Sequence, residues 1–302
     1  MLTTQRKPRL SKEELKVIPG SWLGESHYDI IVDEDADIKD ENGEWLLRYR
    51  RNAIDEKLCR LAWPVLREIK AKTDNRGNAG GAYNNTKRNA VRAGKFRGRV
   101  IKKDKTLSKS NVANSVKSGI IGYYDRYPRI PYCRMTAFNL NNADKFDRIK
   151  PFVSGVADVF KDLGGSRYQS QMEVIRKTNP DFFISGTPFT TITVNQNWRT
   201  AAHRDAGDYE EGMGVMNALT SGNFSGMYLC FPEYGVAVDM RTRGVLLANV
   251  HKWHGNTPVK SSGCYQRVSC IFYYRNKMLE CGSAKEELTR AKKQQERRLY
   301  EV

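Results

Sequence analysis

The chain has 302 residues, with 51 Lys and Arg against 34 Asp and Glu, and a formal net charge of +17. This length allows one large domain or a core with an extension. The charge favours a polyanionic partner, with nucleic acid ranked first and an anionic membrane surface second. The alternative is a basic protein without such a partner. No segment reaches the roughly 18 apolar residues of a membrane span, and the N-terminus lacks the apolar core of a signal peptide. The sequence therefore predicts a cytoplasmic or nuclear protein with no membrane partner.

In the first half of the chain, apolar stretches at 27–32 and 45–49 predict two strands that pair across an Asn42-Gly43 turn. Apolar residues then recur at helical spacing and predict a helix over 55–72, kinked by Pro64. A glycine- and asparagine-rich loop follows. Residues 1–130 are expected to form a mixed N-terminal extension.

The most basic segment is 87–105, which holds nine Lys or Arg and one acidic residue. One interpretation is a DNA-backbone contact surface, and the other is an ordinary solvated charge run. The cations that would contact DNA are Lys87, Arg88, Arg92, Lys95, Arg97 and Arg99.

The second half predicts a helix over 142–163, divided at Pro151, and then many short strands. That spacing is typical of a sandwich or jelly roll. A charged helix over 283–300, begun by a Ser283…Glu286 capping box, is expected on the surface. The strands are expected at 189–195, 226–231, 235–240, 244–250 and 267–275.

Six cysteines are scattered along the chain and none forms a C-x-x-C pair. The sequence therefore indicates neither a zinc knuckle nor a secreted disulfide framework, and reduced thiols are expected. These residues are Cys59, Cys133, Cys230, Cys264, Cys270 and Cys281.

Two histidines and a carboxylate form a candidate metal site. His203 and Asp205 are two residues apart, so both side chains project to the same side of an extended segment. His254 lies after three expected strands and is followed by a glycine that permits close approach. Two histidines with one carboxylate hold a non-haem ferrous ion and leave positions open for oxygen and a co-substrate. His251 is the alternative to His254.

Arg267 is expected on the last strand, with Ser269, Ile271 and Tyr273 on the same face. A guanidinium there can grip a dicarboxylate through a bidentate pair, assisted by the hydroxyl group. The alternative is a salt-bridged arginine of the sheet.

At these residues the chain resembles the TET/JBP family of 2-oxoglutarate- and iron(II)-dependent dioxygenases, which hydroxylate 5-methylpyrimidines in DNA. The likeness is strong over 186–278 and includes PEYGVAVD at 232–239 and HGNTP at 254–258. A weaker likeness reaches back to PYCRMT at 131–136. The chain lacks the cysteine-rich region of animal TET enzymes, so it resembles a compact viral or microbial member of the family. One expectation is a virus-encoded protein that acts in the host cell.

The resemblance implies a cofactor set of Fe(II), 2-oxoglutarate and O₂. His203, Asp205 and His254 would hold the iron, and Arg267 with Ser269 would bind the far carboxylate of 2-oxoglutarate. Further expected contacts are Asn195 and Arg134 for the co-substrate and Asn197 and Arg199 for the substrate.

The expected fold is α+β, with a double-stranded β-helix (jelly-roll) core and supporting helix over 131–282 and a charged C-terminal helix over 283–302. The expected function is oxidation of a flipped 5-methylcytosine in DNA to 5-hydroxymethylcytosine. Thymine oxidised to 5-hydroxymethyluracil is the close alternative. Hydroxylation of protein side chains and an inactive DNA-binding oxygenase fold are the remaining alternatives. The sequence gives no indication of the oligomeric state.

Overall fold

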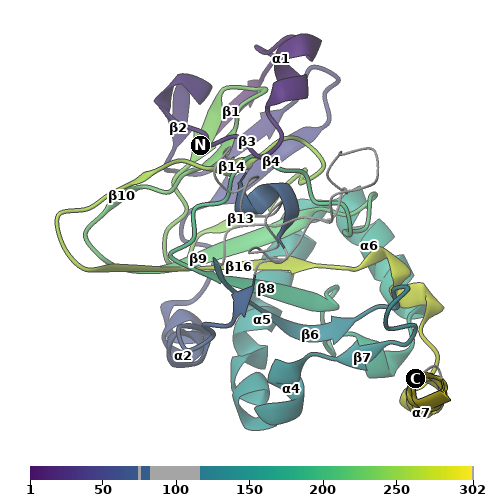
Figure 1. Cartoon of the computed structure of the whole chain (residues 1–302). Coiled ribbons are helices and arrows are strands. Elements are labelled where there is room, and N and C mark those ends of the chain that lie inside the picture. Colours follow the sequence, from purple (N-terminus) through teal and green to yellow (C-terminus); the bar gives the residue numbers. More distant parts are fainter. Residues whose placement is uncertain (74–75, 82–115, 301–302) are drawn as a thin grey trace, which may run out of the picture.

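A ten-stranded sheet forms the centre of the computed structural model, which describes residues 1–73, 76–81 and 116–300 (Figure 1). Its strands pair antiparallel except β1 with β3, which run parallel. Across the sheet the order is β1 (Leu2–Gln5), β3 (Ala36–Lys39), β4 (Trp45–Arg50), β13 (Val245–Ala248), β9 (Gly214–Gly222), β16 (Tyr265–Tyr273), β8 (Thr191–Gln196), β6 (Val116–Tyr124) and β5 (Lys72–Thr73), with β7 (Arg134–Met135) paired to β6.

A four-stranded sheet faces the β3–β4–β13–β9 part of the large one. Its order is β14 (Gly255–Asn256), β11 (Leu229–Phe231), β12 (Val236–Val238) and β2 (Ile30–Val32), and β10 (Ser225–Gly226) pairs separately with β15 (Val259–Lys260). Leu47, Leu246, Phe231 and Val236, from both sheets, share one buried cluster. Two sheets closed over a common core confirm the expected α+β jelly-roll fold.

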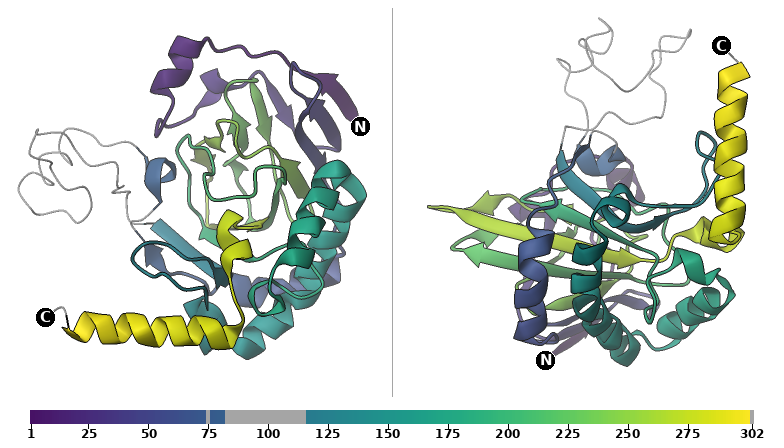
Figure 2. Two further views of the ribbon diagram at one scale, coloured as in Figure 1. Left: turned by 90° about the vertical axis from the view of Figure 1, so that its right-hand side faces the viewer. Right: turned by 90° about the horizontal axis from the view of Figure 1, so that it is seen from below.

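Helices cover the other face of the large sheet (Figure 2). The apolar face of α5 (Ala143–Gly164) packs with α2 (Glu56–Leu66) against β8, β9 and β16. The remaining helices are α1 (Lys12–Val17), α4 (Ala137–Asn141), α6 (Ser166–Lys177), α7 (Ala284–Tyr300) and the 3₁₀ turns η1 (Glu25–His27), η2 (Gly77–Gly80), η3 (Pro180–Phe182) and η4 (Asn276–Glu280). No helix of the described part of the chain is long and apolar enough to cross a membrane.

Several local expectations need correction. The Asn42-Gly43 turn joins β3 to β4, whereas β2 pairs in parallel with β12 of the small sheet. Helix α2 stops at Leu66, shortly after Pro64. Helix α5 continues through Pro151. Proline removes one helical hydrogen bond, but packing of the long buried face of α5 offsets this loss.

The sheet runs across the expected boundary at residue 130. Strands β3 and β4 of the N-terminal part pair with β13, and β6 pairs with β8. The basic segment 87–105, with its six named cations, lies outside the described residues.

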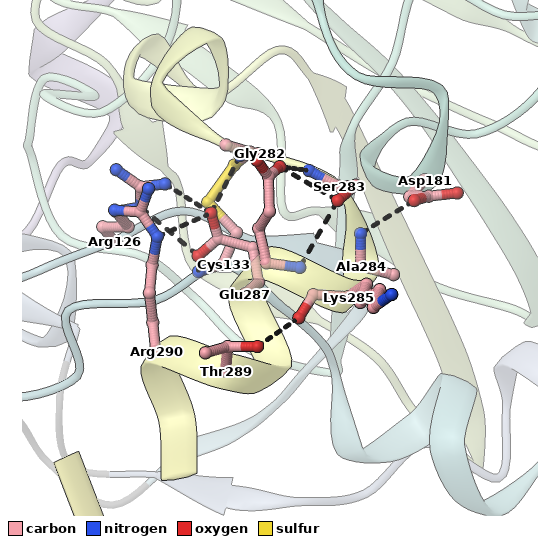
Figure 3. Close-up of polar contacts among 12 residues, drawn as sticks. Arg126, Cys133, Asp181, Gly282, Ser283, Ala284, Lys285, Glu287, Thr289 and Arg290 are labelled. Carbon is pink, nitrogen blue, oxygen red and sulfur yellow. Dashed lines mark hydrogen bonds and ion pairs between the residues drawn. A yellow bond between two sulfur atoms is a disulfide. The ribbon is translucent and has the colours of Figure 1, made fainter. Parts of the chain in front are cut away.

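The expectation of reduced thiols is wrong for one pair, because Cys133 and Cys281 form a disulfide with their Cα atoms 5.7 Å apart. A separation of 148 residues gives no local spacing by which the sequence could reveal this pair. Helix α7 begins as expected, since the Ser283 hydroxyl accepts from the Glu286 amide and the Glu286 carboxylate accepts from the Ser283 amide. Figure 3 shows the disulfide beside this helix start.

Candidate metal and co-substrate site

Backbone pairing brings the two distant halves of the candidate metal site together. His203 and His254 form an isolated antiparallel bridge, in which each backbone amide donates to the other residue's carbonyl, at 2.8 and 3.0 Å. The amide of Asp205 donates to the carbonyl of Val250, just after β13. Backbone hydrogen bonds therefore join the segment that follows β8 to the segment that leads into β14.

The three side chains converge. The Asp205 carboxylate lies 3.5 Å from His203 Nε2 and 3.7 Å from His254 Nε2, and the imidazole centroids are 4.3 Å apart. One ligand atom from each residue falls within 4.8 Å of the others, a spacing that suits a shared metal ion.

Both imidazole rings are oriented by backbone carbonyls. His203 Nδ1 lies 2.8 Å from the Ala201 carbonyl oxygen, and His254 Nδ1 lies 3.0 Å from that of Lys252. A proton on Nδ1 then leaves Nε2 free to act as a ligand. Burial, with the neighbouring His203, lowers the pKa of His254 to about 4, so this ring is neutral near pH 7.

A cavity of about 680 Å³ lies over the three side chains, between the two sheets. From β16 it receives Arg267, Ser269, Ile271 and Tyr273, the alternate residues expected to share one face. Ser269 and Asn195, from neighbouring strands β16 and β8, lie side by side in its wall. Asn195 also accepts a hydrogen bond from the Ser118 hydroxyl at 2.5 Å.

Arg267 is the most informative side chain in this wall. It is 2 % exposed, and its Nη2 has no hydrogen-bond partner among the described residues. Burial lowers the pKa of Arg267 to about 10, so the side chain remains a cation near neutral pH. A buried guanidinium with an unused N–H is costly, and the carboxylate of 2-oxoglutarate is a ligand that would satisfy it. The residues present therefore fit both an iron ion and its keto-acid co-substrate.

Four other candidates lie outside this cavity. Asn197 accepts from the Arg267 amide at 2.6 Å and so fixes the backbone of β16. Arg199 points away, donating to the carbonyls of Leu23 and Asn256, while its neighbours Trp198 and Thr200 line the cavity. Arg134 lines a different cavity. The His251 ring lies 3.1 Å from the backbone carbonyl of Asp205 through Nδ1, and His251 is not part of the three-residue group.

Two polar residues of the cavity were missed in the sequence. Asp208 is 8 % exposed with no partner for its Oδ2, and Arg76 has no partner for its Nε. Burial, with Asp205 nearby, raises the pKa of Asp208 well above its ordinary value. Asp208 follows Asp205 by only three residues, and this spacing could have indicated that Asp208 lies near the metal site. Nothing in the sequence around Arg76 indicates that η2 reaches this cavity.

A jelly roll carrying a His-Asp-His cluster and a buried arginine in one cavity defines the 2-oxoglutarate- and Fe(II)-dependent oxygenases as a class. Within that class, the Tet_JBP model, described as the oxygenase domain of the 2OGFeDO superfamily, matches residues 119–276. This is more than half of the chain, which therefore belongs to the TET/JBP family. Iron(II) and 2-oxoglutarate are the cofactors of the superfamily.

Curated relatives agree with this assignment. The chain is 34 % identical over 189 residues to thymine dioxygenase JBP1 of Trypanosoma brucei brucei, covering 60 % of this chain and 22 % of the relative. It is 36 % identical over 165 residues to thymine dioxygenase JBP1-B of Trypanosoma cruzi, covering 52 % and 19 %. The chain thus spans about a fifth of the length of these relatives.

Among solved structures, NgTET1 in complex with 5mC DNA matches with a TM-score of 0.54 and 13 % identity. The match covers 90 % of this chain and 88 % of that one. At this identity the likeness supports the fold.

Proposed function

We propose that this protein is a 2-oxoglutarate- and Fe(II)-dependent dioxygenase that hydroxylates the C5-methyl group of a pyrimidine in DNA. One observation carries the proposal: a cluster able to hold iron and an unsatisfied buried arginine face the same cavity. An inactive oxygenase fold would have no need to keep a buried guanidinium without an acceptor, since such a group destabilises the protein.

His203, Asp205 and His254 would hold the iron, the imidazoles through Nε2 and the carboxylate through its oxygens. Arg267 would anchor the distant carboxylate of 2-oxoglutarate, with Ser269 beside it on β16. When bound, iron and 2-oxoglutarate supply the means to activate O₂ for hydroxylation of a C–H bond. The protein's own contribution is to orient the ligands, to bind the dicarboxylate and to enclose the reaction between two sheets.

A DNA base would have to leave the helix to reach this cluster. The methyl group of a paired pyrimidine lies in the major groove, and an enclosed site reaches it only after the nucleotide is extruded. The cavity wall offers Trp198 as an apolar surface, with Asp208 and Arg76 as polar groups for the edge of a base. Asp208 is buried and its Oδ2 has no hydrogen-bond partner among the described residues, so its carboxyl group is available to pair with the base.

Two bases are candidates. The sequence expectation placed 5-methylcytosine first, with thymine as the alternative. The curated relatives are named thymine dioxygenases, which supports thymine. The protein-hydroxylase alternative has no comparable support among these relatives.

The decisive experiment is nucleoside mass spectrometry of DNA incubated with the protein, Fe(II), 2-oxoglutarate and O₂. Thymine-containing DNA with and without 5-methylcytosine is compared. We expect 5-hydroxymethyluracil or 5-hydroxymethylcytosine from the wild-type protein and from His27→Ala, a control altered in η1 outside the cavity. We expect none from His203→Ala. Absence of both products from the wild-type protein would reject DNA bases as the substrate.

A further inference from the structure

A second cavity, of about 860 Å³, lies beside the cavity lined by the candidate iron ligands His203, Asp205 and His254. Its wall comes from β6, the end of α2 and the segment around β7 and α4. The two cavities share one lining residue, Arg76, at the start of η2. The second cavity is therefore adjacent to the proposed site of reaction without containing any of the three candidate iron ligands.

The lining of this cavity is strongly positive. Its described residues include five cations and one carboxylate, namely Lys70, Arg76, Arg134, Lys145, Arg275 and Glu68. The carboxylate is already used, because Glu68 pairs with Lys145 at 2.7 Å. Arg275 is also satisfied, by Asp125 at 2.8 Å.

Two arginines retain unused donors. Nη1 of Arg134 and Nε of Arg76 are buried and have no hydrogen-bond partner among the described residues. Burying such a donor without an acceptor is unfavourable. An oxyanion is the kind of acceptor that these two donors lack.

Arg134 is held in position before any ligand arrives. Its guanidinium carbon lies 4.5 Å from the centroid of the Tyr124 ring and 5.3 Å from that of Tyr127. In the sheet, Arg134 is paired directly with Tyr124 across β6 and β7. A guanidinium held against aromatic rings loses little entropy on binding, and its planar group of donors suits a tetrahedral oxyanion.

We propose that this second cavity binds a backbone phosphate of the DNA strand next to the extruded nucleotide, with Arg134 as the principal contact and Arg76 between the phosphate and the base. This inference rests on the proposed function for the identity of the ligand. The positive lining favours a phosphate, and the shared Arg76 places it beside the cavity that would receive the base.

The test is DNA binding by fluorescence anisotropy as a function of salt, with the full chain. Loss of one phosphate contact should lower the slope of log Kobs against log salt by about 1 for Arg134→Gln. Arg134→Lys, which keeps the charge but loses the planar fork, should weaken binding less. Arg60→Gln removes the same charge from an exposed, Glu56-paired position on α2 and should leave the slope unchanged.

Far-ultraviolet circular dichroism and the urea midpoint show whether each variant is folded, and inorganic phosphate is titrated to identify a free-anion site. An unchanged salt slope for Arg134→Gln, in a protein that unfolds at the wild-type urea midpoint, would overturn the inference. A second contrary result is that Arg134→Gln loses the binding of inorganic phosphate while it keeps the DNA affinity of the wild type. That result would show that the cavity binds a free anion and not DNA, and it would contradict the inference. Failure of the proposed function is distinct, because the wild-type protein would then form neither hydroxymethyl nucleoside.

Discussion

At the scale of single residues, the geometry distinguishes histidines that are close in the sequence. His254 turns Nε2 toward Asp205, whereas His251 uses Nδ1 to contact the backbone carbonyl of the same residue. We therefore expect His254→Ala to weaken metal binding more than about 100-fold, since even residues that only orient a ligand are worth about 10–100-fold. His251→Ala should cost no more than about tenfold. Anaerobic titration with Co(II), followed by its visible absorption, measures both, and equal losses would contradict this assignment.

Arg267 allows stability to be separated from binding. Its unpaired Nη2 destabilises the free protein. The free energy of unfolding of Arg267→Met, measured in urea, should therefore be no more than about 1 kcal/mol below that of the wild type, and it should exceed the wild-type value if removal of the buried charge dominates. The same change should raise the half-saturating 2-oxoglutarate concentration about 100-fold, because a buried charge pair can no longer form. A variant that is strongly destabilised yet binds 2-oxoglutarate normally would show that Arg267 is structural.

At the scale of elements, the β3–β4 hairpin depends on a buried carboxylate. Asp37 on β3 accepts from Arg48 at 2.7 Å and from Arg50 at 2.8 Å, both on β4. Burial alone would raise the pKa of Asp37, but the two guanidiniums outweigh it and lower the pKa to about 2. We expect Asp37→Asn to lower the free energy of unfolding by about 3 kcal/mol at pH 7, because two arginines lose their partner.

The pH dependence of this effect has a definite sign. The folded pKa of Asp37 lies below its ordinary value of 3.8, so the stabilisation is complete above pH 3.8 and disappears as the pH falls toward about 2. The difference between wild type and Asp37→Asn in urea unfolding should shrink over that range. Glu34→Gln, at an exposed position near the start of the hairpin, is the matched control. A difference that stays constant from pH 7 to pH 2 would exclude the ion pair as its cause.

The elements that could be predicted from the sequence are those whose residues alternate or recur regularly. In β16 the alternation placed Arg267 and Ser269 on one face, and the helical repeat identified α5. Strand β9 was missed because it is buried along most of its length and shows no alternation. Asn197 and Arg199 lie outside the cavity, where the chain turns after β8 with Asn197 at a positive φ of 46°. Such a turn ends the alternation of faces along β8 and leaves no periodic signal.

At the scale of the whole molecule, the fold brings together segments far apart in the chain, which no local pattern could reveal. The N-terminal strand β4 pairs with β13. Cys281, just before α7, is bonded to Cys133, just before β7. The first turn of α7 is anchored by Glu287, which pairs with Arg126 and accepts from the amides of Cys133 and Gly282 (Figure 3). Burial would raise the pKa of Glu287, but these donors lower it, so the carboxylate stays charged.

The disulfide adds a covalent link to this anchor. Because Cys133 and Cys281 enclose a loop of 148 residues, the bond restricts the unfolded chain strongly, and Cys281→Ser should lower the free energy of unfolding by about 4 kcal/mol. Cys264→Ser, at an exposed free thiol, should have little effect. A reducing agent should reproduce the loss in the wild-type protein and leave Cys281→Ser unaffected. The cluster of His203, Asp205 and His254 lies on other segments, so the folded variant should still bind metal with wild-type affinity. A wild-type protein whose urea midpoint does not respond to reduction would contradict a stabilising role for this bond.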